Sequence, residues 1–164
     1  MENLKISIRP ARIEDGEIIG KFQIACAKET EQKDLHLRTV EAGVLRILSS
    51  MRSGPMGPLK LGEYLVVENE KSEVIACGLI QNQFSDWTCS YYVLIESVYV
   101  RPEYRGKGVL QKIYRFAEEA ARTMAMGQVS EIRSTIAVDN KAMQSAVAKV
   151  GWKETAYKVF AKQL

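Results

Sequence analysis

The clearest chemical signature in the sequence is a basic, glycine-containing turn in residues 101–110, which read RPEYRGKGVL. Gly106 and Gly108 lack a Cβ atom, so backbone N–H groups on either side of them can turn toward one point. A strong helical pattern follows, and the first turn of a helix adds unpaired N–H groups and a partial positive charge. This combination favours a bound phosphate or pyrophosphate.

The same turn also has a purely structural interpretation, in which the glycines serve only a tight connection between a strand and a helix. Two other phosphate-binding motifs do not fit. A Walker A loop needs Ser or Thr after its Gly-Lys pair, and here Lys107 is followed by Gly108. A dinucleotide-binding fingerprint needs a third glycine after Gly108, and none follows at the required spacing.

The charge distribution favours a compact anion over a polyanion. Residues 101–115 hold five basic residues and one acidic residue, a local charge of +4, whereas the whole chain carries only +3. Nucleic-acid binders spread basic residues along a face or a helix. We therefore expect no nucleic-acid partner.

Strands and helices must position this turn, and the hydrophobic periodicity predicts them along the chain. The pattern before the turn predicts a first strand, two helices, a hairpin and a long strand that is apolar on both faces. A strand of this last kind is covered on both sides. These elements are expected at residues 4–8, 15–30, 39–51 with Thr39 as its cap, 64–68, 74–84 and 91–100, with Ser53–Pro58 ending the second helix.

The pattern after the turn predicts two more helices, each followed by a strand. They are expected at residues 110–124 with Gly127 as the stop, 132–138, 143–150 with Gly151 as the stop, and 157–161. Residues 1–164 therefore form one α/β domain of order β-α-α-β-β-β-α-β-α-β. We expect a mostly antiparallel mixed sheet that contains one parallel β-α-β unit, with helices on both faces.

Two segments together resemble the GCN5-related N-acetyltransferase (GNAT) family. Residues 95–109, IESVYVRPEYRGKGV, resemble its acetyl-CoA motif, in which Arg/Gln-x-x-Gly-x-Gly/Ala opens a helix after a strand. Residues 140–152, NKAMQSAVAKVGW, resemble a second motif, in which Asn begins a helix that Gly and an aromatic residue close. The element order matches along essentially the whole chain.

The resemblance implies acetyl-CoA as co-substrate and assigns its binding residues. The pantetheine arm would bond to the main chain of the long strand, much as an added strand would. The pyrophosphate would rest on the amides of the turn, and Asn140 would hold the pantetheine, although Asn140 is also a plausible plain helix cap. The implied cofactor-binding residues are Val98, Tyr99, Val100, Arg105, Gly106, Lys107, Gly108, Val109, Leu110 and Asn140.

Two positions depart from the family pattern. Leu110 occupies the final Gly/Ala place of the first motif, and Val147 stands where many members carry a Tyr that protonates the departing thiolate. A thiol pKa near 8.5 makes the lack of that proton cost only about 2 kcal/mol at neutral pH. Other tyrosines could substitute, and the sequence does not select among Tyr91, Tyr92, Tyr114 and Tyr157.

Glu96 is the expected general base for acetyl transfer to an amine. It is the only charged residue between Asp86 and Arg101, in a strand that otherwise has a buried pattern. Burial raises the pKa of a carboxylate toward useful values, and the group can act through a water. The alternative is a structural carboxylate paired with an arginine. Backbone N–H groups near Val98 or Tyr99 would serve the oxyanion.

The acceptor is expected to be a primary amine, on a small molecule or a peptide. Glu29, Glu31 and Asp34 could attract it, although a solvated connection between two helices is the alternative interpretation. Asp86 and Trp87 could line the entrance, with simple packing as the alternative for Trp87. The three cysteines are expected in the core.

The remaining composition excludes several other functions. A single histidine, His36, rules out catalytic zinc sites built on two or three histidines, and we expect no metal. The N-terminal residues hold no apolar block of signal-peptide length, and polar residues interrupt the only uncharged stretch, so we expect a cytoplasmic protein without a membrane partner. Edge strands and an apolar C-terminal strand make a homodimer plausible.

The sequence thus predicts an N-acetyltransferase that transfers acetyl by direct attack in a ternary complex. A non-catalytic acyl-CoA-binding or sensing module is the alternative, motivated by Val147. A nucleotide-binding regulator that uses only the anion-binding turn is a third possibility.

Overall fold

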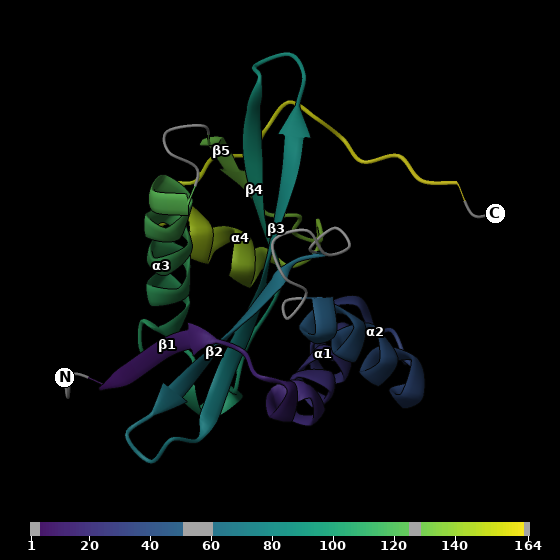
Figure 1. Ribbon diagram of the computed structural model, residues 1–164, viewed down its shortest axis with the longest axis vertical. Helices are drawn as coiled ribbons and strands as arrows, with labels where there is room; N and C mark the ends of the chain where they lie inside the picture. Colours follow the sequence, from purple (N-terminus) through teal and green to yellow (C-terminus); the bar gives the residue numbers. More distant parts are fainter. Residues whose placement is uncertain (1–3, 51–60, 125–128, 163–164) are drawn as a thin grey trace.

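A computed structural model describes residues 4–50, 61–124 and 129–162 of the chain. These residues form a five-stranded sheet whose strands follow one another in chain order (Figure 1). β1 to β4 pair antiparallel, and β5 pairs parallel to β4. The strands are β1 (Ile6–Pro10), β2 (Glu63–Asn69), β3 (Val74–Ser85), β4 (Ser90–Val100) and β5 (Val129–Arg133). The predicted mixed α/β sheet is confirmed.

Helices cover both faces of this sheet, as the apolar pattern of the long strand predicts. Helices α1 (Gly16–Glu31) and α2 (Leu37–Ser50) lie on one face. Helices α3 (Val109–Met124) and α4 (Lys141–Ala148) lie on the other (Figure 1). The central strands are therefore shielded from solvent on both sides, and the turn at residues 101–108 connects β4 with α3.

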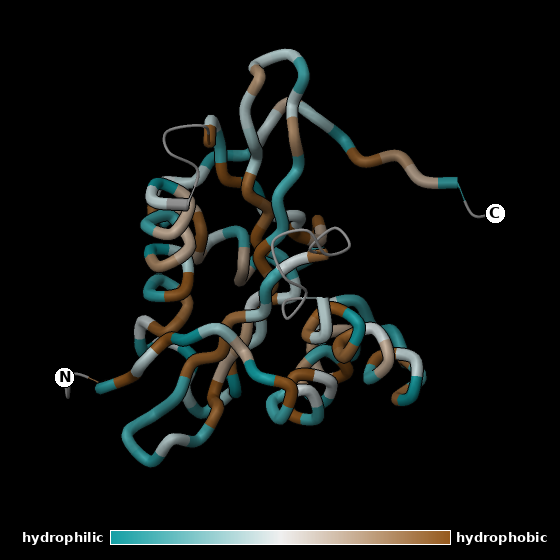
Figure 2. The backbone as a smooth tube through the Cα atoms, viewed as in Figure 1, coloured by the Kyte–Doolittle hydropathy of each residue, from teal (hydrophilic) through white to brown (hydrophobic). Residues whose placement is uncertain are grey.

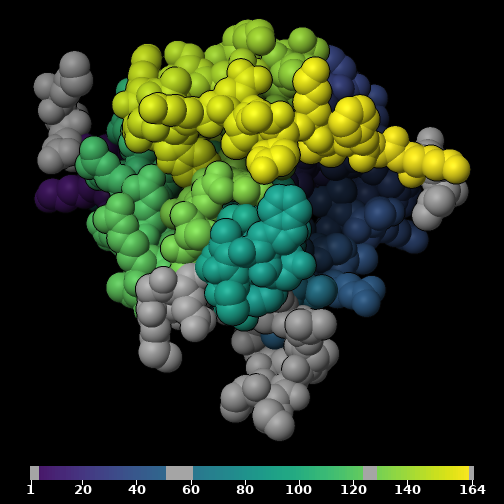
Figure 3. Space-filling view, turned by 90° about the horizontal axis from the view of Figure 1, so that it is seen from above, coloured from purple at the N-terminus to yellow at the C-terminus, as the bar shows by residue number. Residues whose placement is uncertain are grey.

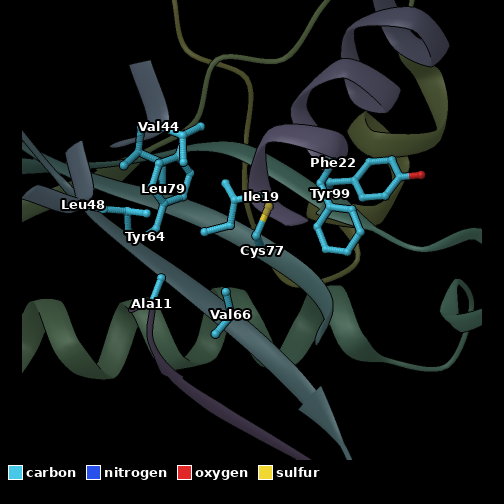
Figure 4. Packing of buried hydrophobic residues seen from close by; sticks show 10 residues of the cluster. All are labelled: Ala11, Ile19, Phe22, Val44, Leu48, Tyr64, Val66, Cys77, Leu79 and Tyr99. Atoms are coloured by element: carbon cyan, nitrogen blue, oxygen red, sulfur yellow. The ribbon is translucent and has the colours of Figure 1, made fainter. Parts of the chain in front are cut away.

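Packing on the α1/α2 face follows the helical spacing of the apolar residues. Ile19 and Phe22 of α1 are buried three residues apart, and Val44 and Leu48 of α2 are buried four apart. Figure 4 shows these side chains together with the strand residues that they meet. The strand residues drawn in this cluster are Tyr64, Val66, Cys77, Leu79 and Tyr99.

The α3 face has a core of its own. Val109, Ile113, Ala117 and Ala121 recur every fourth residue along α3, and all four are buried. Val109 and Ile113 pack with strand residues such as Ile75. Ala117 and Ala121 pack with strand residues such as Ile95. Hydrophobic residues gather in the middle of the strands, whereas the turn between β2 and β3 is mostly hydrophilic (Figure 2).

A partly buried ion cluster connects the first two strands to the start of the first helix. Arg9 donates to both carboxylate oxygens of Asp15, at 2.7 and 3.1 Å, and its side chain also bonds Glu68 of β2. The Arg12 N–H donates to Asp15 Oδ2 at 2.6 Å. Asp15 is only 7% exposed, so the cluster fixes the start of α1 against the sheet.

Several boundaries differ from the prediction. Helix α2 begins at Leu37, so Thr39 lies inside the helix and its N–H donates to His36 O. Strand β5 ends at Arg133, and the expected positions Ile136 and Val138 lie in the connection to α4. The predicted stops at Gly127 and Ser53–Pro58 lie outside the described residues.

The last predicted strand, residues 157–161, is not formed. Residues 156–162 have no strand partner, and Val159 and Phe160 are 83% and 90% exposed. An alternating pattern makes a strand only where a sheet edge lies within reach, and this segment runs away from β5 (Figure 1). The alternative of simple packing for Trp87 is not observed, because its side chain is 89% exposed at the β3–β4 turn. Of the three cysteines expected in the core, Cys77 is buried and Cys26 is half-buried, but Cys89 is exposed.

Candidate functional site

The candidate site begins with an opening along β4. Strand β5 pairs with β4 only over Tyr91–Leu94, so the rest of β4 has no strand partner on that side among the described residues. In the pairing of β3 with β4, Cys77 lies opposite Tyr99 and Leu79 lies opposite Glu96. Between these pairs β3 has one residue and β4 has two, so β4 contains one extra residue. This bulge lies at Ser97, whose φ is 52°.

The bulge and the antiparallel alternation decide which main-chain groups face the opening. The Arg101 N–H donates to Ile75 O of β3, so the alternation directs the main chain of Val100 to the open edge. Val100 O there accepts from Arg105 Nε at 2.8 Å, and Cys26 Sγ lies 3.9 Å from Val98 O. Val98 and Val100 thus offer main-chain groups to a ligand, whereas Tyr99 pairs with β3.

The glycine-containing turn between β4 and α3 lies at the end of this edge. Gly106 and Gly108 have φ values of 72° and 80°, which glycine adopts without strain. A Cβ atom at Gly106 would meet nothing within 4 Å, and at Gly108 only the end of Gln111 at 4.0 Å. The glycines are thus required by backbone conformation, and the space above them is open.

The first turn of α3 supplies the N–H groups that the prediction requires. The helical ladder begins with Lys112 N–H donating to Gly108 O at 3.2 Å, so the three preceding amides have no intrahelical partner. Val109 is 1% exposed and Leu110 packs against the core, so both side chains anchor the turn. The turn can therefore hold a phosphate group through main-chain donors.

An ion pair connects this turn to α1. Arg105 Nη2 lies 2.7 Å from Glu29 Oε2, and Tyr99 Oη donates to Glu29 Oε1 at 3.2 Å. The Arg105 guanidinium also lies 5.4 Å from the centre of the Tyr99 ring. Burial raises the pKa of Tyr99, and the adjacent Glu29 carboxylate raises it further.

The other two acidic residues proposed for the acceptor are paired elsewhere. Glu31 bonds Lys33 and Asp34 bonds Lys28, and all four side chains are exposed. Of the three carboxylates, only Glu29 is directed toward the turn. Asp86 lies at the turn between β3 and β4, at the end of the hairpin that extends beyond the rest of the sheet (Figure 1).

Glu96 lies on the α1/α2 face of β4, beside the bulge. It pairs with Leu79, which belongs to the core of that face. Its Oε1 accepts from Thr135 Oγ1 at 3.2 Å, and within the described ranges it makes no ion pair, so the alternative of an arginine partner is not observed. Gln23 Nε2 donates to Ser97 O at 3.1 Å, next to Glu96.

The second motif lies across the opening on α4. Asn140 Oδ1 accepts from Met143 N–H at 3.1 Å, so the side chain caps the helix and only its amide nitrogen is left for a ligand. Val147 is buried in the same core cluster as Tyr114. Tyr114 Oη donates to Ser134 Oγ at 3.2 Å, and its ring stacks edge-on against Trp152.

Sequence reasoning missed three residues of this region: Gln23, Ser134 and Thr135. They meet the site only because α1 and the segment after β5 converge on the bulge, and no motif marks them. Within the described ranges no cluster of three potential metal ligands occurs. Among these residues, no helix is long and apolar enough to cross a membrane.

Comparisons with known proteins agree with this architecture. The sequence profile of the Acetyltransferase (GNAT) family matches residues 55–152. No curated protein matches the chain. A solved structure described as a possible acetyltransferase from Clostridium difficile 630 is 26% identical, with 97% of each chain covered and a TM-score of 0.83.

Two more distant structures share the fold. An aminoglycoside N-acetyltransferase, AAC(6')-Iy, in complex with CoA is 16% identical, with 98% of this chain and 95% of that chain covered and a TM-score of 0.71. Glucosamine-6-phosphate N-acetyltransferase from Arabidopsis thaliana is 18% identical, with 96% and 98% covered and a TM-score of 0.65. Since the family profile covers more than half of the sequence, the chain belongs to the GNAT family and is an acetyltransferase.

Proposed function

We propose that this acetyltransferase takes acetyl-CoA as its acyl donor and a primary amine as its acceptor. The observation that carries the proposal is the glycine turn at the start of α3, placed directly beyond the unpaired edge of β4. Together they provide anion donors next to a main-chain edge that an amide-containing arm can join. The aminoglycoside N-acetyltransferase that shares the fold was solved with CoA, which supports the choice of donor.

The proposed site residues follow from these positions. The pyrophosphate would contact the amides from Arg105 to Leu110, and the pantetheine arm the main-chain groups of Val98 and Val100. The amide nitrogen of Asn140 would lie on the opposite side of that arm. We assume no metal in the reaction, and the three free thiols fit a reducing compartment such as the cytoplasm.

The proposed reaction is direct attack in a ternary complex. The amine loses a proton, its nitrogen bonds to the acetyl carbon, the carbon–sulfur bond breaks, and the thiolate takes up a proton. Glu96 would accept the first proton through a water, and the main-chain N–H groups beside the bulge would stabilise the oxyanion.

Tyr114 is our proposed donor of the second proton. Tyr91 and Tyr92 lie six or more residues from Val98 along an extended strand, roughly 20 Å away. Tyr157 is 74% exposed on the C-terminal segment. Tyr114 shares a core cluster with both Val147 and Val98, and its hydroxyl reaches the segment that follows β5.

Titration calorimetry followed by an acceptor screen tests the proposal. We expect acetyl-CoA to bind with a Kd well below 1 mM, and ATP to bind more weakly than CoA. Thiol release, measured with a chromogenic disulfide, is then followed over polyamines, amino acids, aminoglycosides and peptides. Affinity weaker than about millimolar refutes the coenzyme assignment, and binding without thiol release for any amine would identify a sensing module.

A further inference from the structure

The face of the sheet that carries Glu96 continues beyond α1 and α2 toward the turn between β3 and β4 (Figure 1). Tyr92 and Leu94 alternate with Val93 and Ile95, which belong to the core on the α3 side, so they lie on the same face as Glu96. Seen from above, the C-terminal segment (yellow) and α2 (blue) lie on two sides of the end of this hairpin (teal) (Figure 3). Tyr92 and Leu94 are half-buried, so the first half of β4 is partly accessible on this face.

The proposed acyl donor leaves this part of the strand to the acceptor. In the proposed complex, the pantetheine arm lies along the second half of β4, at Val98 and Val100, and the phosphates lie on the turn before α3. The amine must then reach the acetyl group from the first half of the strand, across the face that carries Glu96. The acidic side chains at and just after the end of α1, which would attract a polycation, are instead paired with basic residues.

Strands β3, β4 and β5 contain three charged residues, and all three lie on this face. They are Glu96, Glu131 and Arg133. In the parallel pairing of β4 with β5, Glu131 lies opposite Tyr92 and Arg133 lies opposite Leu94, and residues opposite each other share a face of the sheet. Arg133 is therefore the one cation of these three strands, and it lies on the face of the proposed base.

The guanidinium of Arg133 is held in place but has donors to spare. It lies over the Tyr92 ring, 3.8 Å from the ring centre, and 5.8 Å from the centre of the Tyr157 ring. Its Nη2 donates to Glu131 Oε2 at 2.8 Å. Its Nε is shielded from solvent and has no hydrogen-bond partner in the described part of the chain. Because a guanidinium has five N–H donors and a shielded donor without an acceptor is unfavourable, this group is suited to bind a further oxyanion.

Glu131 competes for this cation without neutralising the site. Both side chains of the pair are partly exposed, and ion pairs of this kind contribute little to stability. The stack on Tyr92 fixes the plane of the Arg133 guanidinium independently of Glu131. A planar guanidinium that is fixed in this way matches the geometry of a carboxylate or a phosphate.

One small molecule can reach both the cation and the proposed base along this face. Thr135 Oγ1 donates to Glu96 Oε1 at 3.2 Å, and Thr135 follows Arg133 by two residues, roughly 7 Å in an extended chain. The guanidinium is bonded to Glu131, on the side away from Thr135, so it lies on the order of 10 Å from the Glu96 carboxylate. An amine that carries an anionic group at its other end spans this distance, with a water between the amine and Glu96.

We propose that the acceptor is a small amine with an anionic group, a carboxylate or a phosphate, and that Arg133 binds this group while the amine lies beside Glu96. The inference rests on the proposed acetyl transfer and narrows its acceptor class. Arg133 is then a specificity-determining residue, because it contacts the anion and takes no part in the proton transfers. Tyr92 orients the guanidinium, and Glu131 limits its attraction for the anion.

Matched pairs of acceptors test the proposal on the unaltered protein. Glycine, γ-aminobutyrate and ε-aminocaproate are each compared with their neutral amides, and phosphoethanolamine is compared with ethanolamine. In at least one pair, kcat/KM from thiol release at saturating acetyl-CoA is expected to be at least about tenfold higher for the anionic member. The two kinds of pair show whether the site prefers a carboxylate or a phosphate. Neutral members that react as well as the anionic ones overturn the proposal.

Substitutions of Arg133 and Glu131 are expected to have opposite effects. Arg133→Gln should reduce the preference for the anionic member at least about tenfold, mainly through KM, and Arg133→Lys should restore part of it. Glu131→Gln removes the competing carboxylate and should increase the preference about two- to fivefold. Arg122→Gln, an exposed change on α3, is the control and should leave the preference unaltered. A KM that Arg133→Gln raises equally for both members of a pair would give Arg133 a structural role and overturn the proposal.

Calorimetry with the CoA-bound protein separates a failure of the anion site from a failure of catalysis. An anionic amine that binds without thiol release, and whose binding Arg133→Gln abolishes, supports the anion site and refutes the proposed acetyl transfer. If no anionic amine binds or reacts, the anion site is refuted, whereas the affinity for acetyl-CoA alone reports the donor site. Melting temperatures confirm that each variant folds.

Discussion

At the scale of single residues, the environment of Glu96 bears most directly on the proposed general base. Its carboxylate is half-buried beside a bulge, accepts one hydrogen bond from Thr135, and makes no ion pair with any described residue. The bulge at Ser97 brings it next to the open edge of β4.

Replacing Glu96 by Gln is expected to lower kcat/KM for the amine by about 100-fold or more, the usual contribution of a general base. The amide keeps the size of the side chain, so the affinity for acetyl-CoA should not change. Steady-state rates across pH 5.5–9 check this. Glu119→Gln, an exposed change on α3, is the control, and a profile that Glu96→Gln leaves unaltered contradicts the assignment.

Tyr114→Phe is expected to reduce kcat by about 10- to 30-fold, since protonation of the thiolate is worth up to about 2 kcal/mol. The ring keeps its packing against Trp152, and only the hydroxyl that bonds Ser134 is lost. Rapid-quench measurement of the chemical step, with acetyl-CoA affinity measured in parallel, separates catalysis from binding. Tyr104→Phe, whose hydroxyl accepts from Asn69, serves as the control. An unchanged chemical step would leave solvent as the proton source.

At the scale of elements, the connection from β4 to α3 carries the proposed coenzyme site. The end of the strand has no described strand partner on one side, and the first N–H groups of the helix have no intrahelical partner. Two glycines with positive φ join them without filling the space above. The side chain of Val109 is buried under the turn, so the turn is fixed before any ligand arrives.

Gly108→Ala separates the backbone role of this turn from its binding role. A Cβ at φ 80° costs about 1 kcal/mol, and it also projects toward the space assigned to the phosphates. Gly151→Ala introduces the same backbone cost at φ 91°, at the end of α4, and thus serves as the matched control. We expect similar losses in unfolding free energy for both variants, but a tenfold or greater loss of acetyl-CoA affinity only for Gly108→Ala. Equal affinities in calorimetry would contradict the placement of the phosphates.

At the scale of the whole molecule, helices pack on both faces of one sheet. The Arg9–Asp15–Glu68 cluster bonds the start of α1 to strands β1 and β2 of that sheet. Burial alone would raise the pKa of Asp15. The hydrogen bonds from Arg9 and from the Arg12 N–H outweigh burial, so the pKa of Asp15 lies below its ordinary value. This carboxylate is therefore charged in the folded protein at neutral pH, and its hydrogen bonds to Arg9 stabilise the contact between α1 and the sheet.

Asp15→Asn is expected to lower the free energy of unfolding by about 2 kcal/mol at pH 7. Since the pKa of Asp15 is lower in the folded than in the unfolded chain, its stabilising effect is full above about pH 4 and disappears as pH falls through the folded-state value. Urea unfolding at pH 7 and pH 3 should therefore show the two proteins converging in acid. Glu17→Gln, which removes an exposed pair with Lys21, should change little at either pH. A difference as large at pH 3 as at pH 7 would contradict the mechanism.

The sequence predicted most of the fold because local patterns and tertiary packing agree. The stripes on α1 and α3, the long strand and the glycine turn each match what the structure shows. The prediction failed where an element depends on a distant partner. Residues 157–161 alternate like a strand but find no edge, and β5 begins at Val129 because its partner is β4.

The candidate site was predictable to the same degree. The turn and Asn140 carry motifs, and Glu96 is conspicuous as an isolated charge. The bulge at Ser97 and the approach of Thr135 depend on register, which no local pattern specifies. The pairing of Glu29 with Arg105 joins residues 76 positions apart, so periodicity could not select it over Glu31 or Asp34.

The Glu29–Arg105 pair also bears on how strongly ionic strength controls coenzyme affinity. A diphosphate arriving at the turn competes with a resident carboxylate for the same guanidinium, and the two anions repel each other. Glu29→Gln is thus expected to tighten acetyl-CoA binding about two- to fivefold in dilute buffer. This gain in affinity should disappear in molar salt, because salt screens the repulsion between Glu29 and the phosphates. Calorimetry at both salt concentrations measures the acetyl-CoA affinity, with Glu31→Gln as the control. An affinity that Glu29→Gln leaves unaltered in dilute buffer would mean that Glu29 does not repel the bound phosphates. Tighter binding by Glu29→Gln, in contrast, identifies this carboxylate of the first helix as a competing anion that limits how tightly the acyl donor is held.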